Sequence, residues 1–142
     1  YRTRWALLAI SNHGEVGVDI EEIRPVTGAE DLVCQLFSLA EHAVLHEAKG
    51  AAWWALFYAI WTRKEAWAKM LGMGLALPFA GFSVAHRRGT TVEWLEPGAG
   101  QLCGFSVDEG HAAALACTAP ATINWQHFKY PSRQPVAALL FS

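Results

Sequence analysis

Two segments of this 142-residue sequence place charged side chains at spacings that can bring them to one face. Asp19 and Glu21 stand two residues apart at the end of an apolar run, and strand alternation would point both carboxylates to one side. Glu65 and Lys69 are four residues apart, and in a helix this spacing puts a carboxylate and an ammonium group on one stripe. Carboxylates that share a face can bind a hard cation.

Each pair also has an ordinary structural explanation. Asp19 and Glu21 fit a solvated strand end, where charged side chains are common. Glu65 and Lys69 fit a favourable helix-surface pair, which stabilises a helix by about 0.2–0.5 kcal/mol and needs no function. Taken one at a time, the two pairs therefore leave the chemistry open.

The segments that carry these residues are predicted to be a strand and a long helix. Apolar runs at residues 5–11 and 16–21, separated by turn formers at residues 12–15, predict two antiparallel strands in a hairpin. Residues 51–71 carry aromatic side chains at spacings of three and four, and Gly72 follows where a helix commonly ends. We expect this segment to be a buried core helix.

The remaining patterns predict a single α+β domain over residues 1–142. Short helices are expected at residues 29–36 and 39–49, and Ser38 and Glu41 have the spacing of a capping box before the second. Alternating runs then predict strands at residues 82–86, 91–95, 101–107, 112–118 and 123–128. Together these elements indicate an antiparallel sheet packed against a long central helix.

Composition narrows the class of protein. The hydrophobic content is 53%, and 11 basic against 13 acidic residues give a net charge of −2, which predicts neither nucleic acid nor membrane as a partner. The longest apolar stretch, residues 51–62, falls short of the ~20 residues that a membrane span needs. Cys34, Cys103 and Cys117 form no close pair, which favours a reducing, cytoplasmic location.

Four short motifs, in this order and spacing, resemble the signature of the 4′-phosphopantetheinyl transferases. They are Gly-Val-Asp-Ile-Glu at residues 17–21, Phe-Ser at 37–38 with Glu41, Trp-Thr-Arg-Lys-Glu-Ala-Trp-Ala-Lys at 61–69, and Gly-Met-Gly-Leu at 72–75. The Trp-x-x-Lys-Glu-Ala form resembles the two-domain type that activates surfactin synthetase. The resemblance implies the carboxyl-terminal half of a pseudo-twofold pair, with an amino-terminal half expected upstream of Tyr1 or a second copy completing the cleft.

What the resemblance implies about function is specific. The enzyme would move 4′-phosphopantetheine from coenzyme A to a serine of an acyl or peptidyl carrier protein, releasing adenosine 3′,5′-bisphosphate. The carriers would serve fatty acid, polyketide or nonribosomal peptide synthesis. By correspondence with the family motifs, Asp19, Glu21 and Glu65 match the Mg²⁺ ligands, and Lys64 and Lys69 match lysines near coenzyme A. We expect Lys69 to be catalytic as well, because it shares the face of Glu65.

The catalytic base stays open at this point. The carrier serine must lose its proton, and Glu65, Glu41 or a metal-bound water could accept it. A module that only binds coenzyme A or a carrier protein is the alternative from another class, and broken carboxylates would favour it. Asp19, Glu21 and Glu65 are all present. A structural or assembly domain is the third alternative, and Mg²⁺ with coenzyme A should then leave its melting temperature unchanged.

Overall fold

The computed structural model describes residues 5–118, 123–124 and 136–141. Its elements are β1 (Ala6–Ile10), β2 (Val16–Glu22), α1 (Ala29–Leu36), α2 (Leu39–His46), α3 (Ala51–Met70), the short 3₁₀ turns η1 (Gly74–Ala76) and η2 (Phe79–Gly81), β3 (Ala85–Arg88), β4 (Thr91–Trp94), β5 (Gln101–Phe105), β6 (His111–Cys117), β7 (Ile123–Asn124) and β8 (Val136–Phe141). The predicted α+β class is confirmed. The last predicted strand is β7 in part, and its residues 125–128 lie outside the described residues.

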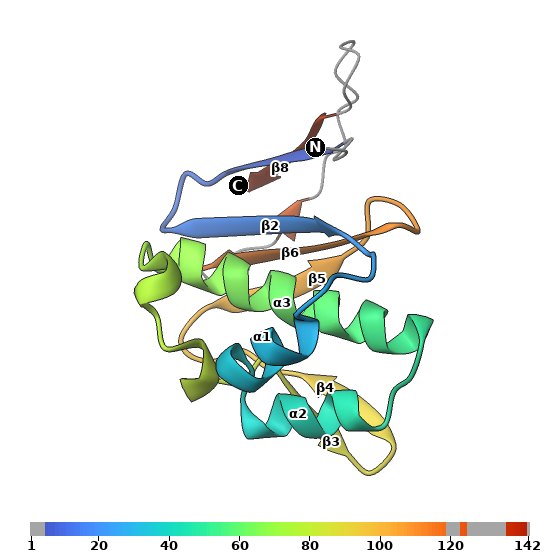
Figure 1. Cartoon of the computed structure of the whole chain (residues 1–142). Coiled ribbons are helices and arrows are strands. Elements are labelled where there is room, and N and C mark those ends of the chain that lie inside the picture. The colour runs from blue at the N-terminus through green and yellow to red at the C-terminus, as the bar shows by residue number, and fades with distance from the viewer. Residues whose placement is uncertain (1–4, 119–122, 125–135, 142) are drawn as a thin grey trace.

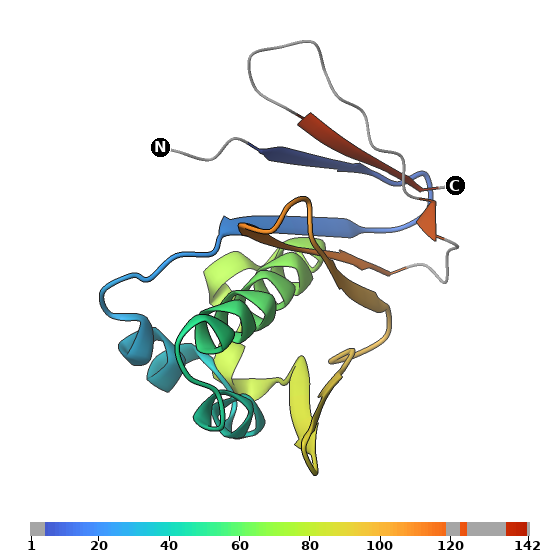
Figure 2. The same ribbon diagram turned by 90° about the vertical axis from the view of Figure 1, so that its right-hand side faces the viewer.

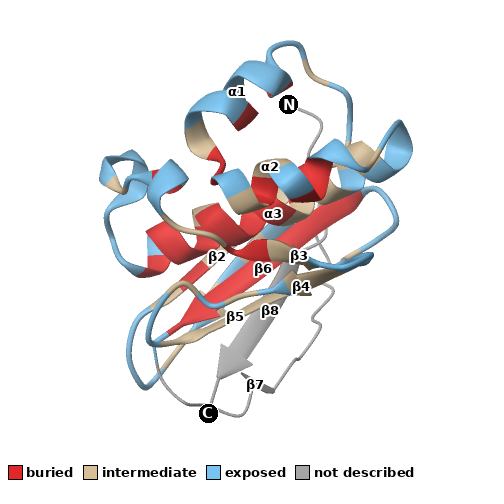
Figure 3. Ribbon diagram, turned by 90° about the horizontal axis from the view of Figure 1, so that it is seen from below, coloured by how far each residue is buried: buried red, intermediate tan, exposed pale blue. Residues whose placement is uncertain are grey.

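The centre of the fold is an antiparallel sheet in the order β2–β6–β5. Helix α3 crosses one face of this sheet, and the sheet formed by β1, β8 and β7 lies beyond the other face (Figures 1 and 2). Helices α1 and α2 and the β3–β4 hairpin lie on the far side of α3. Seen by burial, β6 and much of α3 form the buried centre, whereas β2 is mostly of intermediate burial (Figure 3). The predicted packing of a sheet against a long helix is therefore confirmed.

The predicted hairpin of β1 with β2 is wrong in its pairing, although both strands exist. Strand β1 pairs in parallel with β8, and β2 pairs antiparallel with β6. The start of β2 is tied to the end of β6, because Glu15 N donates to Thr118 Oγ1 at 2.9 Å and Thr118 N donates to Glu15 O at 3.1 Å. Alternation along a sequence identifies a strand but not its partner, so the non-local pairing was invisible to it.

Helix α3 is covered on two sides. The β2–β6–β5 sheet packs on one side, and α1, α2 and the β3–β4 hairpin lie on the other. The amino-terminal half of α3 packs aromatic rings together, with Phe57 stacked on Phe37 at 5.5 Å between centroids. The helix ends at Met70, one residue before the predicted end, and Gly72 follows as predicted with a φ of 68°, which suits glycine. Backbone bonds from Gly72 N to Lys69 O at 3.1 Å and from Met73 N to Ala68 O at 3.2 Å close the last turn. No helix of the described residues is long and apolar enough to span a bilayer.

The capping box before α2 is confirmed. Glu41 N donates to Ser38 Oγ at 3.3 Å, and Ser38 N donates to Glu41 Oε2 at 2.8 Å. The helix stops at His46 and not at residue 49, where it was predicted to end. Ala48 N instead donates to Leu45 O in a closing turn, at 3.1 Å.

Strand β2 approaches α3 so closely that only glycine fits at one position. A Cβ atom on Gly17 would overlap Ala66 O and Met70 N of the helix backbone. We expect Gly17→Ala to force β2 and α3 apart and to lower the free energy of unfolding by about 1–3 kcal/mol or more, as overpacking does. Denaturant unfolding measures this change.

Gly81→Ala is the matched control for that substitution. A Cβ there would meet only the Pro78 side chain, at an ordinary 3.7 Å. Equal stability of the Gly17→Ala and Gly81→Ala proteins would show that the close approach of β2 to α3 has no energetic weight.

Candidate active site

Asp19 projects from β2 toward α3. The alternation predicted for this strand is present, because Val16 and Val18 pack on Leu115 at the opposite face while Gly17 and Asp19 are buried. Lys69 Nζ donates to Asp19 Oδ1 at 2.6 Å, with the lysine side chain 48% exposed and the aspartate side chain 8% exposed. The second oxygen, Asp19 Oδ2, is buried and has no hydrogen-bond partner within the described part of the chain.

Glu21 and Glu65 lie close enough to Asp19 to feel its charge. Burial raises the pKa of Asp19 above its ordinary value, although the bond to Lys69 opposes the rise. Burial and then repulsion from Asp19 raise the pKa of Glu65. Burial, followed by repulsion from Asp19, also raises the pKa of Glu21, with a smaller contribution from Glu65. The structure thus brings together four of the predicted site residues: Asp19, Glu21, Glu65 and Lys69.

The donor chemistry of this carboxylate cluster fits a divalent cation such as Mg²⁺. Its oxygens are the hard ligands that Mg²⁺ prefers, and the bare Asp19 Oδ2 is a buried acceptor that still needs a positive partner. The three carboxylates do not yet form a complete metal site. Among the described residues, no three His, Cys, Asp or Glu side chains lie close enough together to hold a metal ion. Lys69 holds the other Asp19 oxygen. A bound cation would have to share this position with the ammonium group.

Lys64 lies elsewhere, in the interior of the fold, and its predicted contact with the coenzyme stays a prediction. Its side chain is fully buried, and Nζ donates to Phe79 O and Phe82 O, each at 2.6 Å. The same atom forms an ion pair with Glu41 Oε2 at 2.9 Å. Three acceptors use all three donors of an ammonium group, so none is left for a phosphate. One residue along a helix is a turn of about 100°, which carries Lys64 away from the Glu65 stripe.

Glu41 is equally committed to the interior. Its carboxylate accepts from Ser38 N, from Val84 N at 2.8 Å and from Lys64, and the residue is 0% exposed. It therefore links α2, α3 and the segment between η2 and β3. A carboxylate with these partners has no route to a carrier serine, so Glu65 remains the better candidate for the base.

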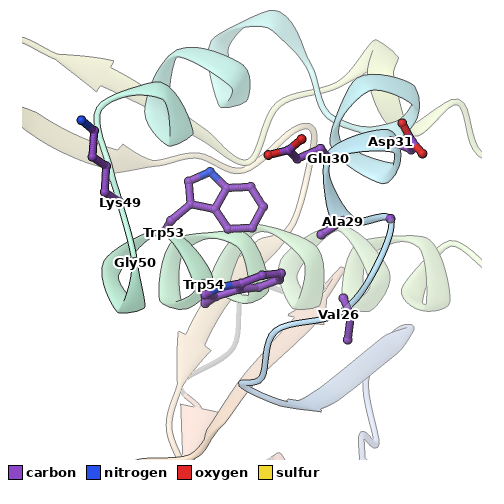
Figure 4. Close-up of a pocket in the computed structure, with 9 residues that line it drawn as sticks. Val26, Ala29, Glu30, Asp31, Lys49, Gly50, Trp53 and Trp54 are labelled. Atoms are coloured by element: carbon purple, nitrogen blue, oxygen red, sulfur yellow. The ribbon is translucent and has the colours of Figure 1, made fainter.

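A cavity of about 540 Å³ that lies away from the carboxylate cluster opens between the start of α1 and the start of α3. The Glu30 carboxylate points toward the Trp53 ring there, and Lys49 and Trp54 are also among the lining residues (Figure 4). None of the four clustered site residues lines it. Glu21 and Glu65 are of intermediate burial, whereas Asp19 is buried.

Sequence reasoning missed a second polar site. Arg63 and His111 are each 9% exposed, and each has a buried ring or guanidinium nitrogen without a partner among the described residues. Arg63 is part of the Trp-x-x-Lys-Glu-Ala motif, but no spacing rule connects it to a histidine 48 positions later in the sequence. Only the folded chain reveals this pair.

The chain matches the family model of the 4′-phosphopantetheinyl transferase superfamily over residues 15–119. It is 46% identical to the 4′-phosphopantetheinyl transferase AcpT of Salmonella typhi over 65 residues, which cover 46% of this chain and 34% of that protein. It is 29% identical to a 4′-phosphopantetheinyl transferase of Bacillus subtilis over 120 residues, which cover 82% of this chain and 52% of that protein.

A solved structure has the same fold. The crystal structure of a holo-(acyl-carrier-protein) synthase from Bacillus anthracis in complex with CoA (3′,5′-ADP) aligns with a TM-score of 0.56 at 18% identity, covering 72% of this chain and 92% of that one. The family model spans most of the chain, so the chain belongs to the 4′-phosphopantetheinyl transferase superfamily. Its matches span between about a third and a half of the length of the curated relatives above.

Proposed function

We propose that this chain carries the metal-binding wall of an enzyme that transfers 4′-phosphopantetheine from coenzyme A to a serine of an acyl or peptidyl carrier protein. The main support is the Asp19–Lys69 ion pair, which lies beside Glu21 and Glu65. Asp19 Oδ2 is buried and has no hydrogen-bond partner among the described residues. Family membership supports the reaction class. The names of the relatives support coenzyme A as donor and a carrier protein as acceptor.

Asp19, Glu21 and Glu65 would hold Mg²⁺ in this proposal. The cation supplies charge neutralisation for the diphosphate when it is bound. The remaining chemistry belongs to the side chains. Lys69 is half-exposed and places a compact positive charge next to the metal carboxylates, where the bridging oxygen would gather negative charge as adenosine 3′,5′-bisphosphate leaves.

The transfer itself needs a proton acceptor. The serine Oγ attacks the β-phosphorus of coenzyme A, the bond from that phosphorus to the bridging oxygen breaks, and adenosine 3′,5′-bisphosphate leaves. The serine proton passes to a base. We propose Glu65 for this role in the state in which Asp19 and Glu21 alone hold the cation, because a carboxylate bound to a cation is a weak base. In the metal-free protein, burial and the charge of Asp19 raise the pKa of Glu65.

The cleft that holds the donor is proposed to need a second wall. Leu8 and Ile10 of β1 are 51% and 50% exposed, and Leu75 after α3 is 80% exposed. Apolar side chains in such positions are typical of a face that another unit covers. We propose that an amino-terminal half of the two-domain type, or a second copy of the chain, covers it. The cytoplasmic location inferred from the cysteine spacing stays a prediction.

Mass spectrometry of an apo carrier protein tests the function. Incubated with coenzyme A and Mg²⁺, the carrier should gain one phosphopantetheine when the chain acts together with its second wall, and little or none with residues 1–142 alone. Transfer that proceeds equally well with EDTA in excess would argue against the metal carboxylates. No transfer to any of several acyl and peptidyl carriers would argue against the enzyme.

Lys69→Ala is expected to lower kcat by roughly 100-fold, with a smaller change in KM for coenzyme A. The reason is that a positive charge facing the departing oxygen of adenosine 3′,5′-bisphosphate matters most when the bond breaks. Steady-state kinetics with the carrier protein in excess measures both constants. Lys49→Ala, an exposed lysine at the other end of α3, is the control. An unchanged kcat with a raised KM would make Lys69 a binding residue only.

A further inference from the structure

The side chain of Arg63 is a buried cation that has no counterion in the part of the chain that the structure describes. It leaves α3 on the face toward β4 and β5, and its guanidinium carbon lies 3.6 Å from the centroid of the Trp94 ring. Nη1 donates to Ala59 O at 2.8 Å, while Nε is buried and has no acceptor among the described residues. Arg63 also forms no ion pair within that part of the chain.

The fold reserves space for this guanidinium. Gly104 of β5 lies against it, and a Cβ atom at that position would overlap the guanidinium group. The group is therefore held between the Trp94 ring and the backbone of β5. Burial lowers the pKa of Arg63 to about 10, because the weak attraction of Cys103 offsets little of the desolvation cost. A fixed, desolvated and uncompensated arginine is well suited to accept an anion.

His111 adds a second unpartnered nitrogen. Its Nδ1 lies 2.8 Å from Asp108 Oδ1. That bond and the indole N–H of Trp5 hold the pKa of Asp108 at about 2, so its carboxylate is ionised and can only accept. The Nδ1 atom must then carry the hydrogen. In the neutral ring, Nε2 is a buried lone pair that lacks a donor among the described residues.

Both nitrogens belong to residues that line one cavity of about 280 Å³, at the β5–β6 end of the central sheet. Ile23, Trp94, Gly104 and Glu109 are also among its lining residues. Asp19, Glu21, Glu65 and Lys69 are not, so the cavity is separate from the carboxylate cluster. It needs an acceptor for Arg63 Nε and a donor for His111 Nε2. Glu109, when ionised, can supply the first but not the second.

We propose that this cavity binds a small oxyanion that still carries a proton, with inorganic phosphate as the probe. An anionic oxygen accepts from Arg63 Nε, and the P–OH group donates to His111 Nε2. A hydrogen phosphate supplies both groups in one ligand that the cavity can hold. Sulfate offers only acceptors at neutral pH, so it cannot donate to His111 Nε2 when that nitrogen carries no hydrogen. Bicarbonate has the same pair of groups as phosphate.

Calorimetric titration with phosphate tests the site, using the full chain in a buffer of constant ionic strength. We expect saturable 1:1 binding that falls at least tenfold in Arg63→Gln and in His111→Ala. Binding should be unchanged in Arg88→Gln and His13→Gln, which replace exposed residues outside the cavity. Circular dichroism establishes that each variant is folded. Sulfate should bind at least tenfold more weakly than phosphate, and bicarbonate should compete with phosphate.

Several outcomes would overturn the proposal. No saturable binding would mean that water satisfies the two nitrogens. Binding that survives both cavity substitutions would be an adventitious ion only, and equal affinity for sulfate would rule out recognition of the proton. The ¹⁵N resonance of His111 Nε2 in the unmodified protein gives a readout that needs no variant. Its shift should follow phosphate with the calorimetric affinity, and a constant shift would also contradict the proposal.

Discussion

Replacing Asp19 by asparagine is expected to lower the rate of transfer by roughly 100-fold or more, while the protein stays as stable as before or becomes more stable. The substitution removes the central carboxylate of the cluster and keeps its shape. Burial raises the pKa of Asp19, so the fold disfavours the charged form even with Lys69 beside it. Loss of that charge therefore lowers the rate of transfer and does not lower the free energy of unfolding.

Transfer kinetics and thermal unfolding, each with and without Mg²⁺ and coenzyme A, measure the two effects. Ligand should raise the melting temperature of the unmodified protein and not of the variant. Stability contributed by a carboxyl with a raised pKa is present at low pH and is lost as pH rises through that value. The free energy of unfolding of Asp19→Asn should therefore equal that of the unmodified protein in acid and exceed it increasingly as pH rises.

Asp31→Asn is the matched control, because Asp31 is an exposed residue of α1 away from the cluster. It should leave both the kinetics and the response to ligand unchanged. Near-normal turnover of Asp19→Asn at saturating Mg²⁺ would remove Asp19 from the metal site.

Replacing Lys64 by methionine is expected to lower the free energy of unfolding by about 3–5 kcal/mol. The ammonium group is the only positive partner of Glu41 among the described residues, and both side chains are 0% exposed. Methionine would leave a buried carboxylate uncompensated and the carbonyl oxygens of Phe79 and Phe82 without their donor. Denaturant unfolding gives the value, and the binding of coenzyme A by the protein that remains folded should change little.

The double variant Lys64→Met with Glu41→Gln separates charge from packing. Once both charges are gone, part of the lost stability should return, so the two substitutions should be non-additive. Lys49→Met, on an exposed lysine, should cost little. If Lys64→Met kept the stability of the unmodified protein but lost affinity for coenzyme A, Lys64 would belong to the donor site as the motif first suggested.

Local features of the fold could be predicted from the sequence, whereas pairings could not. The capping box of Ser38 and Glu41, the bounds of α1 and the stop of α3 before Gly72 depend on a few neighbouring residues. The pairing of β1 with β8 depends on residues more than 120 positions apart, and no local pattern encodes it. The predicted hairpin was the simplest local alternative to that pairing.

The site shows the same division. Strand periodicity predicted Asp19 and Glu21 on one side of β2, without indicating that Asp19 is buried. Helix periodicity put Lys69, not Lys64, on the stripe of Glu65. The interior role of Lys64 could not be predicted, because its three acceptors come from α2 and from the segment around η2. The Arg63–His111 cavity likewise depends on Gly104, whose missing side chain makes room for the guanidinium.

The parallel pairing of β1 with β8 also bears on the order of assembly. The register from Ala6 with Val136 to Ile10 with Leu140 joins the most distant strands of the sequence, so chain closure makes it costly to form early. The layer built from β2, α3 and β6 can form without it. We therefore expect the amides of β1 to exchange with solvent through a partial opening that leaves this layer intact. The outer sheet would be the last part of the protein to fold and the first to unfold.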